Sequence, residues 1–269
     1  MARVAEKEDG GPLFTAADRT RLTYTSCYCE ENAYKLVEAA LAMQAADGGA
    51  PPAASEGVDH EDSAAAAETL EERSDGGRKL FVLFISSRGR AVPIWCQKAA
   101  AGPAEPVVWD YHVVVLDDGG GAAPTYVYDF DTTLPFATEL DTYLRFAFPA
   151  EVQPQLEAAY RPLFRVVPAR DMLDYFASDR SHMRKAGGGW QAAPPPYACL
   201  KGPRAPKPMM LHAFLDLRLK PGGFDFLAPP RTLPQLRGAF GLSKVQLPLG
   251  ARTVDDVHDG GGGGGGGRG

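Results

Sequence analysis

The chain has 269 residues, of which 45% are hydrophobic and 23% charged, and its formal net charge is -6. This is the composition of an ordinary globular protein with a sizeable core in one or two domains. The acidic balance argues against a nucleic-acid-binding protein, and no apolar run approaches the roughly 20 residues that cross a bilayer. Its charged first residues predict no secretory signal, and its four cysteines suggest no disulfide framework. We therefore expect a cytoplasmic or nuclear protein that binds neither nucleic acid nor membranes.

The first strong helical pattern starts shortly after Ser26, where apolar residues begin to recur at helical spacing. Ser26 is predicted to cap the helix, and Glu30 and Glu31 favour the positive end of its dipole. Cys29 shares the apolar face of this helix, whereas Cys27 lies on the more polar side. If one of the two thiols meets a base on a sheet, it should therefore be Cys29.

Two parts of the chain have a biased composition that cannot supply a core. Residues 45–77 are rich in Ala, Gly, Pro, Glu and Asp and lack aromatic residues, which predicts a low-complexity insertion. We also expect residues 1–19 and the glycine-rich residues 246–269 to be flexible termini. A single domain would then span residues 20–245, interrupted by the insertion.

A run of strands is predicted after the insertion. The apolar run 80–85 and the segment 91–96 are close enough to form a hairpin. Two further strands, 107–116 and 125–130, lie on either side of a loop at 117–124. We expect these strands to form a sequential, mostly antiparallel sheet with a buried face.

Helical patterns dominate the rest of the chain. Apart from one strand at 164–167, they lie at residues 139–148, 153–160, 169–176, 209–217 and 233–240. The Gly- and Pro-rich residues 187–208 are predicted to be irregular. A helix, a block of strands and then further helices predict an α+β fold, an α-β-α layered domain with a mostly antiparallel central sheet.

The two strands beside the loop carry a histidine and carboxylates. A hairpin that closes symmetrically pairs Leu116 with Thr125 and places His112 opposite Asp129. Cross-strand neighbours have Cβ atoms about 4.5–5.5 Å apart, so the carboxylate can orient the imidazole. A slip of one residue would put the two side chains on opposite faces. Because a helix start and a nearby histidine can lower the pKa of a thiol, Cys29 completes a Cys-His-Asp arrangement.

Other interpretations of these residues remain open. Both Cys27 and Cys29 can be simple helix-start cysteines, and a lone histidine in a strand is often structural. Cys27, Cys29 and His112 are also metal-ligand types, but Cys-x-Cys is narrower than the usual spacing of structural zinc sites. We therefore expect neither a metal nor a cofactor.

The remaining histidines and cysteines are less informative. His60 and His258 lie in biased or terminal segments and are expected to be solvated. His182 can line a pocket or cap a helix end. Cys96 and Cys199 have apolar or Pro-rich neighbours and are expected to be packed rather than reactive.

Several short segments together carry a resemblance to a known family. They are SCYCEEN at 26–32, WDYHV at 109–113, YDFDT at 128–132, LPF at 134–136, ASDRSHM at 177–183 and PPPY at 194–197. From about Tyr24 to Gly241 the chain resembles the protein N-terminal glutamine amidohydrolase family, with WDYHV as the most distinctive string. The Ala-rich insertion and the glycine tail have no counterpart in this pattern, and Ala137 stands where proline is expected.

The resemblance implies a monomeric enzyme that converts an N-terminal glutamine of a protein or peptide to glutamate and releases ammonia. Its context would be the N-degron pathway, and its fold would be similar to papain-like and transglutaminase-like enzymes. The family's nucleophile, base and orienting acid fall on Cys29, His112 and Asp129 of the 20–245 domain.

Selectivity for a chain terminus requires acceptors for the substrate's α-ammonium. Glu30, Asp110 and Asp179 are candidates, although caps and surface charges are the commoner roles of such residues.

Two other classes of function remain open. A papain-like protease or a transglutaminase would use the same three groups on another acyl substrate, and a non-catalytic module would bind N-terminal glutamine without turnover.

Overall fold

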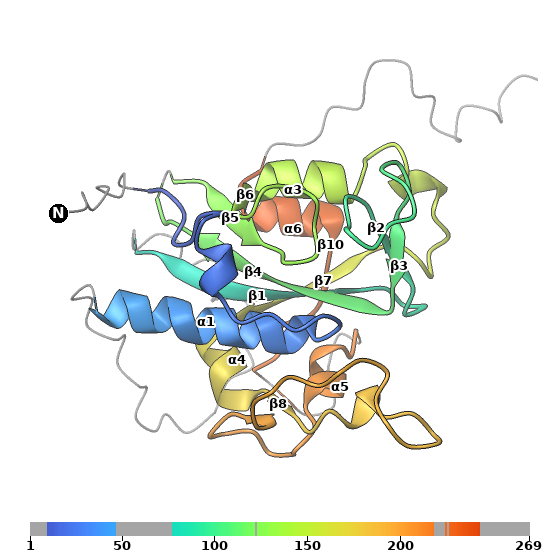
Figure 1. Cartoon of the computed structure of the whole chain (residues 1–269). Helices are drawn as coiled ribbons and strands as arrows, with labels where there is room; N and C mark the ends of the chain where they lie inside the picture. The colour runs from blue at the N-terminus through green and yellow to red at the C-terminus, as the bar shows by residue number, and fades with distance from the viewer. Residues whose placement is uncertain (1–9, 47–76, 122, 218–223, 225, 243–269) are drawn as a thin grey trace, which may run out of the picture.

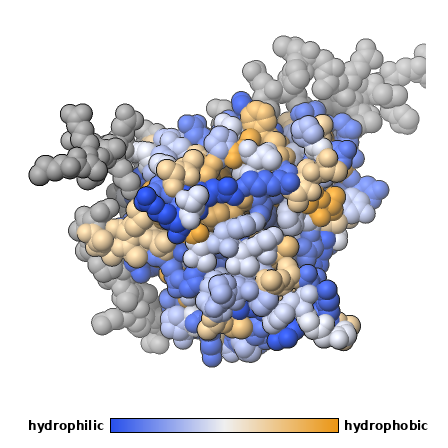
Figure 2. Space-filling view, in the orientation of Figure 1, coloured by the Kyte–Doolittle hydropathy of each residue, from blue (hydrophilic) through white to orange (hydrophobic). Residues whose placement is uncertain are grey.

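The computed structural model describes residues 10–46, 77–121, 123–217, 224 and 226–242. The predicted glycine-rich tail and nearly all of the predicted insertion lie outside the described residues. No helix in the described ranges is long and apolar enough to cross a membrane. The face shown in Figure 2 is largely hydrophilic, with apolar residues in scattered patches.

A six-stranded sheet forms the centre of the described part of the chain, in the order β10-β7-β1-β4-β5-β6 with every pair antiparallel. Its strands are β1 (Lys79–Ser86), β4 (Tyr111–Asp118), β5 (Thr125–Tyr128), β6 (Thr138–Glu139), β7 (Leu163–Pro168) and β10 (Arg231–Thr232). Two small sheets pair β2 (Val92–Ile94) with β3 (Val107–Trp109), and β8 (Ala177–Ser178) with β9 (Leu200–Lys201).

Helices cover both faces of the central sheet (Figure 1). They are α1 (Cys29–Ala46), α3 (Leu140–Ala147), α4 (Ala169–Tyr175), α5 (Leu211–Phe214) and α6 (Leu233–Ala239). In Figure 1, α3 and α6 lie on one side of the sheet, and α1, α4 and α5 lie on the other. The predicted α+β class and its layered α-β-α arrangement are confirmed.

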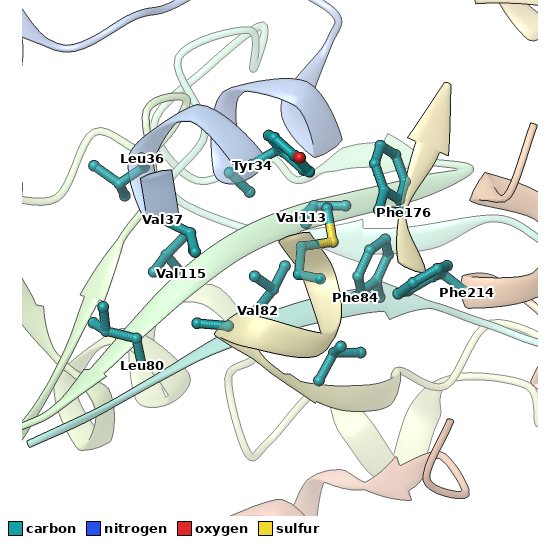
Figure 3. Packing of buried hydrophobic residues seen from close by; sticks show 14 of the residues in the cluster. Tyr34, Leu36, Val37, Leu80, Val82, Phe84, Val113, Val115, Phe176 and Phe214 are labelled. Carbon is teal, nitrogen blue, oxygen red and sulfur yellow. The ribbon is translucent and has the colours of Figure 1, made fainter. Parts of the chain in front are cut away.

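Two apolar clusters hold the layers together. Alternate residues of a strand point to opposite faces, so Val82 and Phe84 lie in the cluster on the α1 side, whereas Leu83 and Ile85 lie in the other. Figure 3 shows Val37 of α1 packed near the sheet residues of the first cluster. Burial on both faces explains why β1 is a continuous apolar run in the sequence rather than an alternating one.

The predicted hairpin between residues 80–85 and 91–96 is wrong. β1 pairs with β4 and β7, and β2 pairs with β3 in a separate small sheet. The apolar pattern identified both strands but not their partners. β1 pairs with the distant β4, which is longer and buries more residues than the nearby β2. The helix expected at 153–160 is a 3₁₀ turn at Gln153–Gln155.

Part of the arm that was expected to be flexible packs on the sheet. Leu13 and Phe14 are buried in the cluster on the α1 side. The Leu13 N–H donates to the Asp117 carboxylate at 2.8 Å, and the Phe14 N–H donates to the Tyr128 hydroxyl at 3.0 Å. Two apolar side chains and two hydrogen bonds from the backbone therefore anchor Leu13 and Phe14 on the sheet. The polar residues around them in the sequence gave no sign of this packing.

Candidate active site

A tight turn places Cys29 at the first position of α1. Cys27 has a φ of 68°, in the left-handed region, and its side chain is exposed. The Asn32 carboxamide closes the turn, accepting from the Thr25 N–H at 2.7 Å and donating to the Thr25 carbonyl at 2.8 Å. The cap predicted at Ser26 is wrong, because α1 begins only at Cys29, and Asn32 instead ties the preceding turn to the helix. The turn leaves Cys27 in solvent and directs Cys29 to the sheet.

The Cys29 thiol lies against the backbone of β4. β5 pairs with residues 115–118 of β4 and leaves the start of β4 unpaired on this side. The Val113 N–H in that part of the strand forms a hydrogen bond with the thiol. Burial raises the pKa of Cys29 well above its ordinary value and Glu30 adds to this, whereas the Val113 N–H opposes it. Burial and Glu30 thus outweigh any lowering of this pKa by the helix start. The resting thiol is protonated, so its activation requires a base.

His112 and Asp129 form a buried pair at the end of the β4–β5 ladder. His112 Nε2 lies 2.9 Å from Asp129 Oδ1, and the residues are 1% and 3% exposed. The predicted register was wrong by two residues, because Asp118 rather than Leu116 pairs with Thr125. An even shift leaves both side chains on the same face, so the predicted pairing survives as a diagonal contact.

Four donors hold Asp129 in place. Besides His112, its carboxylate accepts from the Tyr143 hydroxyl at 2.9 Å, from the Gln97 Nε2 at 3.3 Å and from the Asp131 N–H at 2.8 Å. Burial alone would raise the pKa of Asp129, but His112 and these hydrogen bonds lower it to about 2. Asp129 is therefore a fixed anion. No pattern in the sequence indicated Tyr143 and Gln97, which reach this site from α3 and from the segment after β2.

The His112 ring keeps one nitrogen unused. Burial lowers the pKa of His112, but the attraction and hydrogen bond of Asp129 outweigh it and raise the pKa above 6.5. Trp109 stacks on the imidazole with ring centroids 5.3 Å apart. His112 Nδ1 is buried and has no hydrogen-bond partner among the described residues. Since Nε2 faces the anion of Asp129, Nδ1 is the nitrogen that can accept a proton.

Cys27, Cys29 and His112, the metal-ligand trio considered above, do not form a group of clustered ligand atoms in the described residues. Within the described ranges, ligand atoms of His112, Asp129 and Asp131 do lie within 4.8 Å of one another. His112 and Asp129 bond each other directly, and Asp131 Oδ1 accepts from the Tyr24 hydroxyl at 2.6 Å. Because these hydrogen bonds occupy His112 Nε2, the Asp129 carboxylate and Asp131 Oδ1, the group fits a hydrogen-bonded pair better than a metal site.

A second polar group surrounds Cys29 on the other side. Glu30 is 0% exposed, and its Oε2 accepts from the Tyr111 hydroxyl at 3.1 Å and lies 3.7 Å from Cys29 Sγ. His182 Nε2 lies 3.3 Å from Glu30 Oε1 and 3.4 Å from the Tyr111 hydroxyl. We call Glu30, Tyr111 and His182 the Glu30 cluster. Glu30 is thus no surface charge, and His182 lines the site.

Glu31 is also buried, but it has a different partner. The Arg180 guanidinium donates to both Glu31 oxygens, at 2.9 and 2.8 Å, and also to the backbone carbonyl of Tyr197 at 3.0 Å. This ion pair fastens the segment that carries His182 to the start of α1. Both glutamates lie in the first turn of α1, as predicted, but they are buried rather than surface charges, because the loop around Arg180 covers them.

The other two candidate acids have local roles. Asp110 is exposed, and its carboxylate accepts from the Tyr111 N–H at 3.0 Å. Asp179 accepts from the Ser181 N–H at 2.9 Å. Cys96 is half-buried, whereas Cys199 is exposed, contrary to the expectation that it is packed.

A thiol at a helix start near a buried His–Asp pair is the set of groups that thiol-dependent acyl-transfer enzymes use. The sequence model of the N-terminal glutamine amidase family matches residues 24–222, and the chain belongs to this family. It is 38% identical to the protein N-terminal glutamine amidohydrolase of Danio rerio over 182 residues, 68% of this chain and 74% of the relative. The Homo sapiens protein of the same name is 36% identical over 206 residues, 76% and 82% of the two chains. The resemblance carried by the motifs is confirmed.

Proposed function

We propose that this protein is an amidohydrolase that converts the side chain of an N-terminal glutamine to glutamate and releases ammonia. Family membership and the names of the relatives support this reaction. The observation that carries the chemistry is the His112–Asp129 pair, whose second ring nitrogen is buried and unpartnered. Cys29, at the first position of α1, is the proposed nucleophile.

The first half of the reaction forms a thioester. His112 Nδ1 takes the thiol proton while Cys29 Sγ attacks the glutamine Cδ, giving a tetrahedral oxyanion. The backbone N–H of Cys29 has no intrahelical partner at the helix start and can donate to this oxyanion. The imidazolium then protonates the nitrogen, the C–N bond breaks, and ammonia leaves.

Hydrolysis of the thioester completes the cycle. His112 Nδ1 takes a proton from water, and the resulting hydroxide adds to the thioester carbon. Collapse of this intermediate breaks the C–S bond, releases the glutamate side chain and returns the proton to sulfur. Throughout, Asp129 holds the tautomer with hydrogen on Nε2 and stabilises the imidazolium. Cys29 and His112 share no hydrogen bond in the described residues, and such contacts often tighten only with substrate bound.

The biological setting is also part of the proposal. In the N-degron pathway the new N-terminal glutamate would be a substrate for arginylation. We propose a monomer that acts in the cytoplasm or the nucleus on proteins and peptides with a free N-terminal glutamine, without nucleic acid or membrane. The catalytic unit would be residues 20–245, with the architecture of papain-like and transglutaminase-like enzymes.

One assay tests the reaction and its rivals together. The purified full-length chain is incubated with peptides that begin with Gln, Asn or acetyl-Gln, and ammonia and product masses are measured. We expect ammonia and the amide-to-acid mass change from the Gln peptide alone. Peptide cleavage would indicate a protease, and coupling to an added amine would indicate a transglutaminase. Binding of the Gln peptide with no turnover would leave a non-catalytic module and contradict the proposal.

A further inference from the structure

The Glu30 cluster contains a buried carboxylate with an unused acceptor. Oε2 accepts from Tyr111, but Oε1 has no hydrogen-bond partner among the described residues. His182 Nε2 lies 3.3 Å from Oε1 without the alignment of a hydrogen bond. Removing a carboxylate from water without full compensation is costly, so such an oxygen requires an explanation.

The neighbouring acids do not share this property. Both Glu31 oxygens accept from Arg180, and Asp110 and Asp179 each accept from a backbone N–H nearby. Glu30 alone among these four acids is in contact with the Cys29 sulfur, at 3.7 Å. The carboxylate that carries the unused Oε1 therefore lies, through its Oε2, beside the sulfur that a substrate must approach.

From this geometry we propose that Glu30, held by Tyr111 and His182, binds the α-ammonium of the substrate's N-terminal residue. The inference rests on the proposed deamidation and adds the group that restricts it to free N-termini. An ammonium supplies charge-assisted donors, and its positive charge compensates the buried carboxylate. An acetylated terminus or an internal glutamine offers only a neutral N–H.

The lengths of the groups agree with this assignment. Four bonds of about 1.5 Å join the α-nitrogen of glutamine to Cδ, so these atoms are at most about 5 Å apart. Attack requires Cδ within about 3–3.5 Å of sulfur, and a charge-assisted hydrogen bond places nitrogen about 2.8 Å from the carboxylate. Because sulfur lies 3.7 Å from Oε2 of the same carboxylate, one glutamine residue can reach both the sulfur and the unused Oε1.

The assignment also explains why a carboxylate can lie beside a nucleophilic thiol. A carboxylate beside a nucleophilic thiol opposes thiolate formation, and Glu30 follows burial as a cause that raises the pKa of Cys29. A bound ammonium offsets that charge and makes proton transfer from sulfur easier. The thiol is then activated chiefly when a free N-terminus is present.

The test compares two substrates that differ only in the ammonium. One peptide begins with Gln, and the other begins with the des-amino analogue, in which hydrogen replaces the α-ammonium. We expect wild-type kcat/KM to be at least about 30-fold higher for the Gln peptide, because the loss of one partner of a buried charge pair typically has an effect of this size. In Glu30→Gln this preference should vanish, because the neutral amide no longer attracts the ammonium. The matched control is Glu38→Gln, in an exposed residue of the same helix, and it should retain the preference.

Three outcomes overturn the inference. If wild-type protein processes both peptides equally well, no group reads the ammonium. If Glu30→Gln lowers turnover of both peptides equally, Glu30 acts on the thiol or the fold instead. Calorimetry on Cys29→Ala separates the inference from the reaction, because Gln peptide should bind it more tightly than the des-amino peptide even if turnover is absent. Equal binding of the two peptides also overturns the inference.

Discussion

The site contains two buried carboxylates, Asp129 and Glu30, which differ in how many of their acceptor atoms are hydrogen-bonded. Asp129 accepts four hydrogen bonds, from His112, Tyr143, Gln97 and a backbone N–H, and its acceptors are occupied. Glu30 accepts two on Oε2, from the Tyr111 hydroxyl and the Cys29 thiol, and keeps Oε1 unused. A saturated carboxylate can orient a catalytic group, whereas an unsaturated one is available to a ligand. Neutralising each should therefore have different consequences.

Neutralising the saturated carboxylate should have the largest effect. Asp129→Asn removes the anion that fixes the His112 tautomer, and we expect kcat for the Gln peptide to fall by about 10³- to 10⁴-fold. The loss should be equal for the des-amino peptide, because Asp129 acts on the base. An ammonia assay with both peptides measures this. A loss confined to the Gln peptide would reverse the roles assigned to the two carboxylates.

The adjacent residues Glu30 and Glu31 give a second contrast, in stability. Glu31→Gln leaves the buried Arg180 guanidinium without its anion, and we expect it to lower the free energy of unfolding by about 3–5 kcal/mol. Glu30→Gln keeps an acceptor for Tyr111 and should change stability by less than about 1 kcal/mol. Urea unfolding of both variants measures the difference. Equal losses would mean that Glu30 is as much a structural group as Glu31.

The pH dependence of activity should report the His112–Asp129 pair. Because His112 must be neutral to act as a base and its pKa is raised above 6.5, the acidic limb of kcat/KM should have its midpoint above pH 6.5. In Asp129→Asn, burial remains as the main influence on the pKa of His112 and lowers it. The residual activity should therefore have its acidic limb below pH 6.5. A pH profile of both proteins shows the shift. An unmoved limb would mean that another group acts as the base.

The smallest expected effect is on the pH dependence of stability. The lowered pKa of Asp129 stabilises the fold above its ordinary value of 3.8, and this contribution is lost as pH falls through about 2. The raised pKa of His112 stabilises the fold below 6.5 and is lost as pH rises through the raised value. The stability difference between wild type and Asp129→Asn should therefore be largest between about pH 4 and 6.5. Urea midpoints across this range test it, and a difference that grows above pH 7 would contradict it.

The proposed catalytic groups could be predicted from local patterns. Helical spacing separated Cys29 from Cys27, and strand alternation put His112 and Asp129 on one face. The register was wrong by two residues because the loop does not close symmetrically, and an error of one residue would have separated the pair. Prediction succeeded here because strand periodicity tolerates an even error.

The Glu30 cluster could not be predicted in the same way. Glu30 and Glu31 look like solvated helix-start charges until the segment around Arg180 and His182 covers them. That segment is separated from α1 by about 150 residues, as in the Arg180–Glu31 pair with its sequence separation of 149. Local composition carries no signal for such a contact. The same limit explains the wrong hairpin, since the partners of β1 are distant in the sequence.

The central claim is that Cys29 is the nucleophile, and replacing each of the two neighbouring thiols tests it most directly. Cys29→Ala and Cys27→Ala are assayed for ammonia release from a peptide that begins with Gln, with thermal unfolding as a check on the fold. We expect Cys29→Ala to lose activity by at least about 10⁴-fold. Cys27 is exposed and should be replaceable with most of the activity retained. Full activity of Cys29→Ala, or loss of activity only in Cys27→Ala, would contradict the account.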